Sequence, residues 1–309
     1  MLIIDGNFHD KLSKKTYIAL GSFDGLHLGH MKLIKGCIEI AKANEAYSMV
    51  YTFRNHPRTV VNPDFVPKLL MSNDTKLDIL NRAGIDITCL AEFNTELMKL
   101  SPEEFVLKLL NNFSMSGVII GFNYKFGYKN TGNVDLLKEL SIKYGFSVTV
   151  ITPHNDSNGL ISSSRIRSLL EQGEIEDANK LLYEPFKLSG KVIDGKKLGR
   201  KIGYPTANIL VEKCYAIPKV GVYYTMVRHN NTLYKGMTNI GFNPTVSSDN
   251  TIKIETFILD FNGNIYNDNI ELFFINRIRD EVKFDSIEEL ILQMNKDCGY
   301  VQGKNKVDL

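Results

Sequence analysis

Two different periodicities divide the chain near residue 185. Before that point, short apolar runs of β type alternate with helical segments. The apolar runs cover residues 17–23, 47–53, 85–93, 116–122 and 146–152. Strands that are apolar on nearly every residue and alternate with helices are typical of a parallel sheet covered on both faces. We therefore predict an α/β domain over residues 1–185, with ligands outside the carboxyl ends of its strands.

The helical segments of this first half carry their own start and stop signals. Residues 101–113 begin with Ser101 as the predicted N-cap, Pro102 at the first helical position and Glu104 closing a capping box. Another helical segment ends at Gly84, a residue type that favours the left-handed conformation at a helix end. These local signals support the alternation of helices and strands.

The pattern changes after residue 186. Short β-type runs follow one another, with tight turn signals such as "HNNT" and "NGN" between them. The β-type runs cover residues 187–193, 221–229, 232–240, 252–261 and 270–278. This pattern predicts an antiparallel, hairpin-rich barrel over residues 186–309. A final helix is predicted over 286–297, with Ser286 as N-cap and Glu289 at the capping-box position.

Composition narrows the class of protein. The 309 residues are 43% hydrophobic and 23% charged, which suits two globular domains, and the net charge of +2 argues against a nucleic-acid or anionic-membrane binder. Four separated cysteines without a CxxC pair favour a reducing cytoplasm. Neither a signal peptide nor an apolar run near the ~18 residues of a membrane span is visible. We expect a cytoplasmic monomer or weak homo-oligomer that acts on small molecules, without a nucleic-acid or membrane partner.

Two histidines lie three residues apart at a strand-to-helix corner. Residues 21–30, "GSFDGLHLGH", follow a β-type run and precede a helical pattern over 31–43. Backbone amides at a glycine-rich turn attract anions, and the helix dipole adds to this. His27 and His30 would lie on one side of the helix start, where they can stabilise charge on a phosphate during transfer. The open alternative is a packing or capping histidine, while a zinc site lacks a third ligand at an obvious spacing.

A second phosphate-friendly turn lies in the carboxyl half. In "GRKIGYPTAN", the backbone amides near Gly199, Gly203 and Tyr204 can approach a nucleotide. Thr206 offers a hydroxyl and Asn208 a carbonyl oxygen, and oxygen ligands are those that Mg²⁺ prefers. The alternative is a polar connector between strands.

One carboxylate of the barrel lies on an otherwise apolar strand face. In "IKIETFILDF", the alternation of a strand puts Lys253, Glu255, Phe257 and Leu259 on one face. A carboxylate beside Phe and Leu is either paired or functional. A salt bridge with Lys253 remains the alternative to a catalytic role.

Two motifs of the first half resemble one enzyme family. "GSFDGLHLGH" resembles the H-x-G-H signature of nucleotidyltransferases, and its longer form G-x-F-D-G-x-H-x-G-H is similar to the amino-terminal domain of the prokaryotic bifunctional riboflavin kinase/FMN adenylyltransferases, also called FAD synthetases. "ISSSRIRSLL" resembles the S-S-T-x-I-R segment of that family, although a capped helix with solvent arginines would look alike. The resemblance implies a Rossmann-like nucleotidyltransferase domain, with His27 and His30 catalytic. The ATP contacts it implies are Gly21, Phe23, Asp24, Gly25, His27, Gly29, His30, Ser162, Ser163, Ser164 and Arg165. Asp24 is interpreted first as a turn organiser and second as a metal or ribose ligand.

Two further segments resemble the family in part. The loop "GFNYKFGYKNTGN" resembles a glycine-aromatic loop that helps to place the flavin, which implies flavin contacts at Asn123 and Phe126. Lys125 and Asn133 stand where arginine and aspartate are common, and in "TFRNHPRTV" Asn55 replaces a proline of T-F-x-P-H-P. These departures motivate an alternative in which a working kinase carries an amino domain that binds nucleotide but adenylylates poorly.

The carboxyl half resembles the riboflavin kinase part of the same family. "GYPTAN" matches the G-x-P-T-A-N hallmark, and the likeness continues through "GVYYTMV", "MTNIGFNPTV", "IETFILDF" and "INRIRDEVKFDSIEELILQMNKD". The resemblance implies a riboflavin kinase β-barrel with a final helix, in which Thr206 and Asn208 hold the Mg-nucleotide. It makes Glu255 the general base for the riboflavin ribityl hydroxyl, and it places Arg277 and Glu281 in the flavin site.

The resemblance spans both halves in the right order and so implies a bifunctional flavin-cofactor enzyme. The carboxyl domain would transfer the γ-phosphoryl group of ATP to riboflavin, and the amino domain would join AMP to FMN, giving FAD and pyrophosphate. ATP would be the co-substrate and Mg²⁺ the cofactor. A rival from another class is a flavin- or RNA-binding regulator with the same fold, which the near-neutral charge disfavours for RNA. A class I tRNA synthetase core has a related histidine corner, but its second, lysine-rich signature is lacking here.

Overall fold

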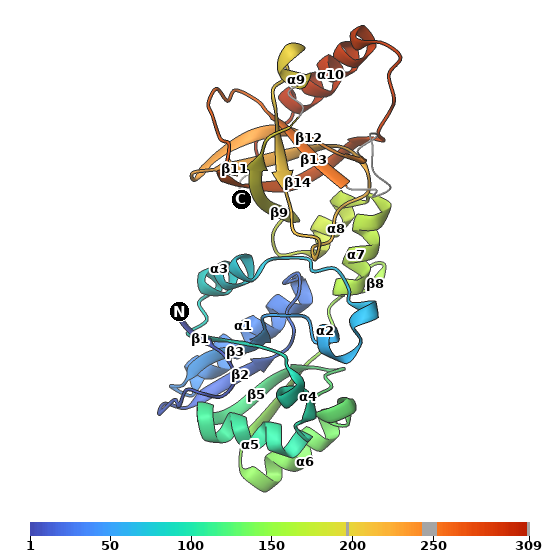
Figure 1. Cartoon of the computed structure of the whole chain (residues 1–309). Helices are drawn as coiled ribbons and strands as arrows, with labels where there is room; N and C mark the ends of the chain where they lie inside the picture. The colour runs from blue at the N-terminus through green and yellow to red at the C-terminus, as the bar shows by residue number, and fades with distance from the viewer. Residues whose placement is uncertain (196–197, 243–251, 308–309) are drawn as a thin grey trace. The chain divides into compact units, whose positions relative to one another are not determined.

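The chain forms two compact units (Figure 1). The computed structural model describes residues 1–195, 198–242 and 252–307. The first unit is Met1–Ser163 and the second is Ser164–Leu309. Each unit has its own sheet and its own apolar clusters, so each is described by itself.

The sheet of the first unit is parallel throughout, as predicted. Its strands are β1 (Leu2–Asp5), β2 (Thr16–Leu20), β3 (Tyr47–Phe53), β4 (Ile87–Ala91), β5 (Met115–Gly121) and β6 (Ser147–Ile151). They lie in the order β1-β4-β3-β2-β5-β6, and every pairing is parallel. The sequence did not predict the edge strand β1, because a four-residue strand is too short to show a period.

Helices cover both faces of this sheet. The longer ones are α1 (Leu28–Ala43), α3 (Asn73–Ala83), α5 (Pro102–Phe113) and α6 (Val134–Tyr144). The shorter elements are α2 (Arg58–Val61), α4 (Thr95–Lys99), η1 (Pro63–Phe65), η2 (Tyr128–Asn130), β7 (Asn155–Asp156) and β8 (Gly159–Leu160). Ala19 of β2 packs in one core cluster with α1 and α3, while its neighbour Ile18 packs in the other with α5 and α6. Successive residues of a strand thus serve opposite faces, which explains why the strand is apolar on every residue.

Helix ends form where the sequence predicts them. The Ser101 hydroxyl accepts a hydrogen bond from the Glu104 amide at 3.2 Å, and the Glu104 carboxylate accepts one from the Ser101 amide at 2.7 Å. The capping box of α5 is therefore complete. Gly84 ends α3 in the left-handed region, with φ 90°.

The second unit contains a closed antiparallel barrel, as predicted. Its strands are β9 (Lys187–Ile193), β10 (Thr206–Leu210), β11 (Gly221–His229), β12 (Thr232–Phe242), β13 (Ile252–Ile258) and β14 (Asn269–Arg279). The order around the barrel is β10-β13-β12-β11-β14-β9. β10 lies where we predicted only a turn, because its two buried apolar residues, Ala207 and Ile209, are too few to reveal a period. Within "MTNIGFNPTV", the residues from 243 on lie outside the described part of the chain.

Two helices precede the barrel strands in sequence, one lies between β9 and β10, and one follows β14. They are α7 (Ser163–Gln172), α8 (Ile175–Leu181), α9 (Leu198–Lys201) and α10 (Ile287–Gln302). Ser286 caps α10 by accepting from the Glu289 amide at 3.2 Å, and the helix continues past its predicted end at residue 297. Val301 of α10 packs with Met237 of β12 in one cluster, so α10 covers part of the outer barrel face.

The barrel interior holds a short chain of hydroxyls. The Oγ1 atoms of Thr225 and Thr238 lie 2.8 Å apart, and Thr238 donates to Thr256 at 2.9 Å. All three threonines are fully buried. Because side chains alternate along a strand, the neighbours of these threonines point to the outer face. That outer face carries the polar residues described below.

Candidate functional site

The histidine corner lies where the strand order reverses. From β2 the chain continues to β3 and β4 on one side, and it later fills β5 and β6 on the other. The loops that follow β2 and β5 therefore diverge, and ligands of parallel sheets bind at such a point. Residues 21–27 follow β2, and Asn123 follows β5. The topology thus brings the predicted ATP loop and the predicted flavin loop to one edge of the sheet.

His27 caps α1 and stacks on His30. The His27 Nδ1 accepts a hydrogen bond from the His30 backbone N–H at 3.3 Å, and the ring centroids lie 3.6 Å apart at 17°. A ring nitrogen that accepts is unprotonated, so neutral His27 carries its proton on Nε2. Phe23 meets the His30 ring edge to face at 5.3 Å. Capping uses only Nδ1, so the capping alternative and the phosphate-donor hypothesis are compatible.

Both histidines are neutral at pH 7. Burial, with His154 as the second cause, lowers the pKa of His27 to about 4. Burial also lowers the pKa of His30 well below its ordinary value, with His27 and Lys76 as further causes. The buried His30 Nδ1 has no hydrogen-bond partner within the described residues. A buried polar atom without a partner is a favourable place for a hydrogen bond to a ligand.

The turn before His27 has an unusual backbone. Phe23, Gly25 and Leu26 all have positive φ, at 47°, 85° and 36°. Non-glycine residues adopt this region only when their surroundings enforce it. The Asp24 carboxylate does so in part, because its Oδ1 accepts from the Leu70 amide at 2.9 Å. Asp24 therefore makes the turn-organising contact that was its first interpretation.

The serine-rich segment reaches this turn through one residue. Ser163 Oγ donates to the Asp24 carbonyl oxygen at 2.8 Å, within the first unit. Ser162 precedes α7, whereas Ser164 and Arg165 begin the second unit. Ser164 is exposed and Arg165 is half-buried. The predicted phosphate-binding segment thus starts at the turn that carries the histidines.

Two basic residues at this corner, His154 and Lys76, were not predicted from the sequence. A Cβ added to Gly29 would lie 3.2 Å from the His27 ring and 3.6 Å from the His154 Cβ, so the bare glycine lets both histidines approach. His154 lies in the loop after β6, where no pattern marks it. Lys76 in α3 is only 5% exposed. The sequence did indicate the burial of Lys76, because it lies three residues before Ile79 and so shares the buried face of the helix.

The flavin loop exposes Asn123 and buries most of Phe126. Asn123 is exposed directly after β5, as a ligand contact requires. Phe126 is only 6% exposed and stacks on Tyr124 at 5.6 Å in the core under the sheet. The flavin contact of Phe126 stays a prediction. Phe122, 45% exposed, is the aromatic side chain that the loop presents to solvent.

The three departures from the family pattern have local explanations or lie in solvent. Asn55 accepts from the Phe93 amide at 2.8 Å and donates to the Phe93 carbonyl at 2.9 Å, so it ties two loops together. Asn133 caps α6 by accepting from the Leu136 amide at 2.9 Å, as an aspartate would. Lys125 is exposed. None of these residues disturbs the histidine corner.

The glycine turn before β10 depends on close backbone approach. The Tyr204 amide donates to the Gly199 carbonyl at 2.8 Å, so this amide serves the turn, whereas we had predicted that it approaches a nucleotide. A Cβ on Gly199 would come closer than 3.0 Å to the Tyr204 carbonyl oxygen. Gly203 has φ 86°, which suits glycine. Tight folding of this segment places Thr206 at the start of β10.

A cavity of about 600 Å³ adjoins this turn. Its polar lining includes the cation of Arg200 and the Thr206 side chain, and its apolar lining includes Ile258, Phe261 and Ile265. A cavity of this size with both apolar and polar lining groups is typical of small-molecule sites. The size and lining fit a nucleotide, with a base on the apolar side and phosphates near Arg200.

Glu255 lies in a polar row on the outer barrel face. It is paired across the sheet with Asn208 on one side and Asn239 on the other. Thr206 lies two residues from Asn208 and so shares its strand face. The salt bridge left open by the sequence is present, with Lys253 Nζ 3.1 Å from Glu255 Oε1. Both partners are about one-third exposed, so the ion pair leaves the carboxylate accessible.

Arg277 and Glu281 lie near the ends of β12 and β14. The Arg277 guanidinium donates to a backbone carbonyl at 2.8 Å and to Asp280 at 2.7 Å. Its buried Nε has no partner within the described residues. Glu281 lies against Gly241, where a Cβ would collide with its carboxylate, and Gly241 is paired with Lys253. Glu281 thus approaches the end of the row that holds Glu255.

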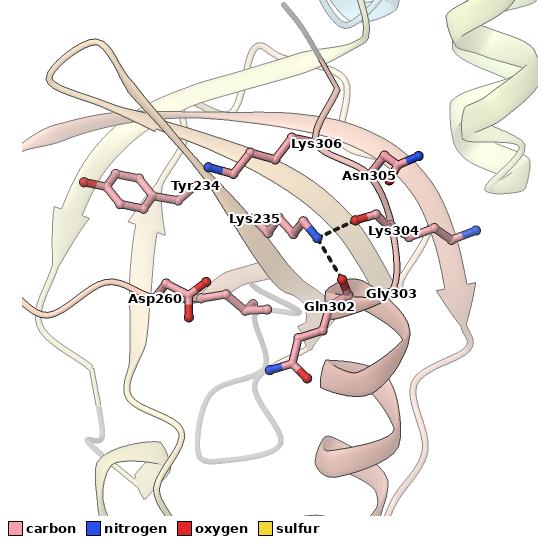
Figure 2. A pocket seen from close by; sticks show the side chains of 9 residues that line it. Tyr234, Lys235, Asp260, Gln302, Gly303, Lys304, Asn305 and Lys306 are labelled. Carbon is pink, nitrogen blue, oxygen red and sulfur yellow. Dashed lines mark hydrogen bonds between the residues drawn. The ribbon is translucent and has the colours of Figure 1, made fainter.

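Another cavity lies beside the end of α10, and three lysines are among its lining residues (Figure 2). Lys235 Nζ donates to the carbonyl oxygens of Gln302 and Lys304. Lys306 donates to a carbonyl of β12 at 3.4 Å, and the Lys304 ammonium lies 4.5 Å from the Tyr300 ring centre. These cations hold the end of the chain on the barrel. We assign no ligand to this cavity.

Metal-binding and membrane-spanning features were also sought. In the described ranges, no group of three or more His, Cys, Asp and Glu side chains is arranged to hold a metal ion. No helix there has the length and apolar character needed to span a bilayer. Within the described part of the chain, Cys37, Cys89, Cys214 and Cys298 form no disulfide. Burial raises the pKa of Cys37 and of Cys89 to about 12, so neither is a reactive thiolate.

Family models match both halves of the chain in order. The model described as FAD synthetase matches residues 9–165, and the model described as riboflavin kinase matches residues 182–303. The first match contains the histidine corner and the flavin loop. The second contains the glycine turn, the Glu255 row and all of α10.

Relatives match along nearly the whole chain. A bifunctional riboflavin kinase/FMN adenylyltransferase from Listeria monocytogenes is 39% identical, over 91% of this chain and 89% of its own. One from Buchnera aphidicola subsp. Schizaphis graminum is 36% identical, over 94% and 95%. A crystal structure of a macrolide-efflux protein from Streptococcus pneumoniae is 28% identical at TM-score 0.88, over 99% of this chain and 100% of that one, which shows a shared fold. The chain belongs to the bifunctional riboflavin kinase/FMN adenylyltransferase family, with a nucleotidyltransferase-like first unit and a riboflavin kinase barrel in the second.

Proposed function

We propose that this chain phosphorylates riboflavin in its second unit and adenylylates the resulting FMN in its first, with ATP as the donor in both steps. The observation that carries this proposal is the coexistence of two separate phosphate-binding constellations, one in each family-matched half. One is the stacked pair of His27 and His30 at the start of α1. The other is the glycine turn with Thr206, Asn208 and Glu255.

The adenylyl step is a displacement at the α-phosphorus of ATP. An oxygen of the FMN phosphate forms the new P–O bond, the α–β bond breaks, and pyrophosphate leaves. The nucleophile is already anionic, so positioning and charge stabilisation are sufficient. His27 donates a hydrogen bond to the ATP phosphates from Nε2, and His30 forms one through its unpartnered Nδ1. The amides at the start of α1 add to this anion site, and Asn123 contacts the flavin.

The phosphoryl step moves the γ-phosphoryl group of ATP to the terminal ribityl hydroxyl of riboflavin. Glu255 accepts the hydroxyl proton, and Lys253 at 3.1 Å holds that carboxylate in position. The nucleotide occupies the cavity beside Arg200 and Thr206. Arg277 and Glu281 shape the flavin end of the site.

Magnesium fits the second unit by the chemistry of its donors. A hydroxyl, an amide oxygen and a carboxylate share one face of β10 and β13, from Thr206, Asn208 and Glu255. Mg²⁺ prefers such oxygen ligands together with water and phosphate oxygens. Thr206 and Asn208 would hold the ion, which would neutralise charge on the nucleotide phosphates. The four free thiols favour a reducing compartment, and we place the reactions in the cytoplasm.

Product analysis tests the proposal directly. The purified chain is incubated with riboflavin, ATP and Mg²⁺, and flavins are separated by chromatography. We expect FMN first and FAD afterwards. FMN that accumulates without FAD, even when pyrophosphate is removed, would contradict the adenylyl half and favour the kinase-only alternative.

Two substitutions separate the units. His27→Ala should abolish FAD formation and spare FMN formation, with the exposed His9→Ala as control. Glu255→Gln should stop FMN formation, while FMN that is supplied is still converted to FAD; Glu212→Gln is the matched surface control. Equal loss of both activities in either folded variant would contradict two independent sites.

A further inference from the structure

Lys76 is a buried cation that the proposed reaction has not yet used. It lies in the first turn of α3 and is only 5% exposed. Lysine is rarely buried to this extent unless its ammonium group has partners. Its side chain shares the buried face of α3 with Ile79 and Leu80. A packing role alone would be served better by an apolar residue.

The partners of Lys76 lie at the carboxyl ends of two neighbouring strands. Its Nζ donates to the Ser22 carbonyl at 3.2 Å, to the Phe53 carbonyl at 3.3 Å and to Thr52 Oγ1 at 3.5 Å. Thr52 Oγ1 itself donates to the Ser22 carbonyl at 2.9 Å. Three donors thus meet three acceptors, as an ammonium group requires. Ser22 begins the turn that leads to His27, so Lys76 ties this turn to the end of β3.

Lys76 also brings a fixed positive charge to this corner. His27 and His30 are neutral at pH 7, as shown above. Burial lowers the pKa of Lys76 to about 8, against the opposing attraction of Asp24, so most of this group is protonated at pH 7. Lys76 lines a small pocket together with Ser22, Asp24 and Asn55. A polyphosphate at the histidine turn would therefore meet this cation at short range.

We propose that Lys76 is a positioning residue for nucleotide transfer in the first unit: its buried ammonium group fixes the histidine turn against β3 and supplies charge that balances the bound polyphosphate. This inference rests on the proposed adenylyl transfer. A fixed charge in a site closed to water stabilises developing negative charge without reorganisation. His27 contacts the nucleotide directly, whereas Lys76 acts by holding the Ser22 carbonyl and through the electric field of its charge.

The main test replaces the ammonium group and keeps most of the volume. Lys76→Met should lower kcat/KM for FAD formation from FMN and ATP by about 10- to 100-fold. FMN formation from riboflavin in the same protein should be unchanged and reports an intact second unit. Arg82→Met, at the surface end of the same helix, is the matched control. Wild-type FAD formation by Lys76→Met would overturn the inference and leave the proposed function standing.

A second variant separates charge from packing. Lys76→Ala should be equally impaired, and propylammonium should restore part of its FAD formation, since the cation can re-enter the space that the side chain left. Propanol of matched size should not. Equal rescue by both compounds would show a packing role and overturn the inference. This comparison uses Lys76→Ala alone and therefore still decides the question if Lys76→Met fails to fold. If the wild-type protein itself makes no FAD, the proposed function falls and this inference with it.

Discussion

A methyl group on Gly199 should silence the kinase and spare the adenylyltransferase. Gly199 and Tyr204 close the turn before β10 through a hydrogen bond of 2.8 Å between the Tyr204 amide and the Gly199 carbonyl. A Cβ on Gly199 would lie 3.2 Å from the Tyr204 carbonyl carbon and closer than 3.0 Å to its oxygen. The obstructing atoms belong to the backbone, so no side chain can rotate away. The turn must open, and it carries Thr206 two residues later.

The size of the effect follows from the size of the collision. Relieving the contact requires a backbone shift of about 1 Å, and a displacement of that size in a catalytic constellation can cost about 100-fold in rate. We therefore expect Gly199→Ala to lower kcat/KM for FMN formation by about 100-fold. FAD formation from supplied FMN is measured in the same sample and should stay at the wild-type rate.

The control for this prediction is another glycine of the same unit. Gly299 lies inside α10, and nothing is within 4 Å of its added Cβ. Gly299→Ala should keep both activities and raise stability by about 0.5–1 kcal/mol, because alanine is the better helix residue. Full kinase activity in Gly199→Ala would refute the reasoning, since the close approach of Gly199 to Tyr204 would then not matter.

The remaining predictions concern the first unit. His27→Ala should cost about 1 kcal/mol of stability through the lost N-cap. His27→Asn should restore the cap, as measured in thermal melts, but not FAD formation, as measured by chromatography. A His27→Asn variant that forms FAD would exclude donation from Nε2. The pKa of His27 is lowered from 6.5 to about 4 on folding, so the unfolded chain binds more protons between these values and the free energy of unfolding should fall as pH falls. This group changes the free energy of unfolding by at most about 1.4 kcal/mol per pH unit. In urea titrations, the free energy of unfolding of His27→Asn should therefore depend less on pH than that of the wild type. An equal dependence in both proteins would contradict the burial argument. Asn133→Asp should stay within about 0.5 kcal/mol of wild type in denaturant melts, because either residue caps α6, while Asn133→Ala should lose about 1 kcal/mol; an unaffected alanine variant would show that the cap contributes nothing.

Much of the fold could be predicted because its signals are local. The parallel sheet follows from strands that are apolar on nearly every residue, as Ile18 and Ala19 illustrate by entering opposite cores. The capping box of Ser101 and Glu104 is complete within four residues of sequence. Two strands were found only in the structure. β1 has only four residues, and β10 has only two buried apolar residues.

The candidate site was predicted where its residues are neighbours in sequence. His27 and His30 stack because they are three apart at a helix start, a relation that the chain itself imposes. Alternation along β13 likewise put Lys253 and Glu255 on one face, where they form an ion pair. Spacing alone could not choose between pairing and function, and the structure shows that the pair leaves Glu255 accessible.

Contacts between distant segments belong to the tertiary structure alone. The burial of Phe126 is one such feature, because Tyr124 and the core beneath the sheet enclose it. Asn55 looked like a loss from the family pattern, but it bonds Phe93, thirty-eight residues away. Lys76 likewise hydrogen-bonds Ser22, which is distant from it in the sequence.

The sequence by itself determined the two-part architecture, the helix caps and the two glycine-containing turns of this protein. These features depend on side-chain period and on groups within one turn of each other, which the order of residues specifies directly. Only the tertiary structure decided which polar groups are charged at the histidine corner. Burial lowers the pKa of His27 and of Lys76 to different final values, about 4 and about 8. The cost of burying a charge depends on what surrounds it, and at this corner the surroundings come from β2, β3, α3 and the loop after β6.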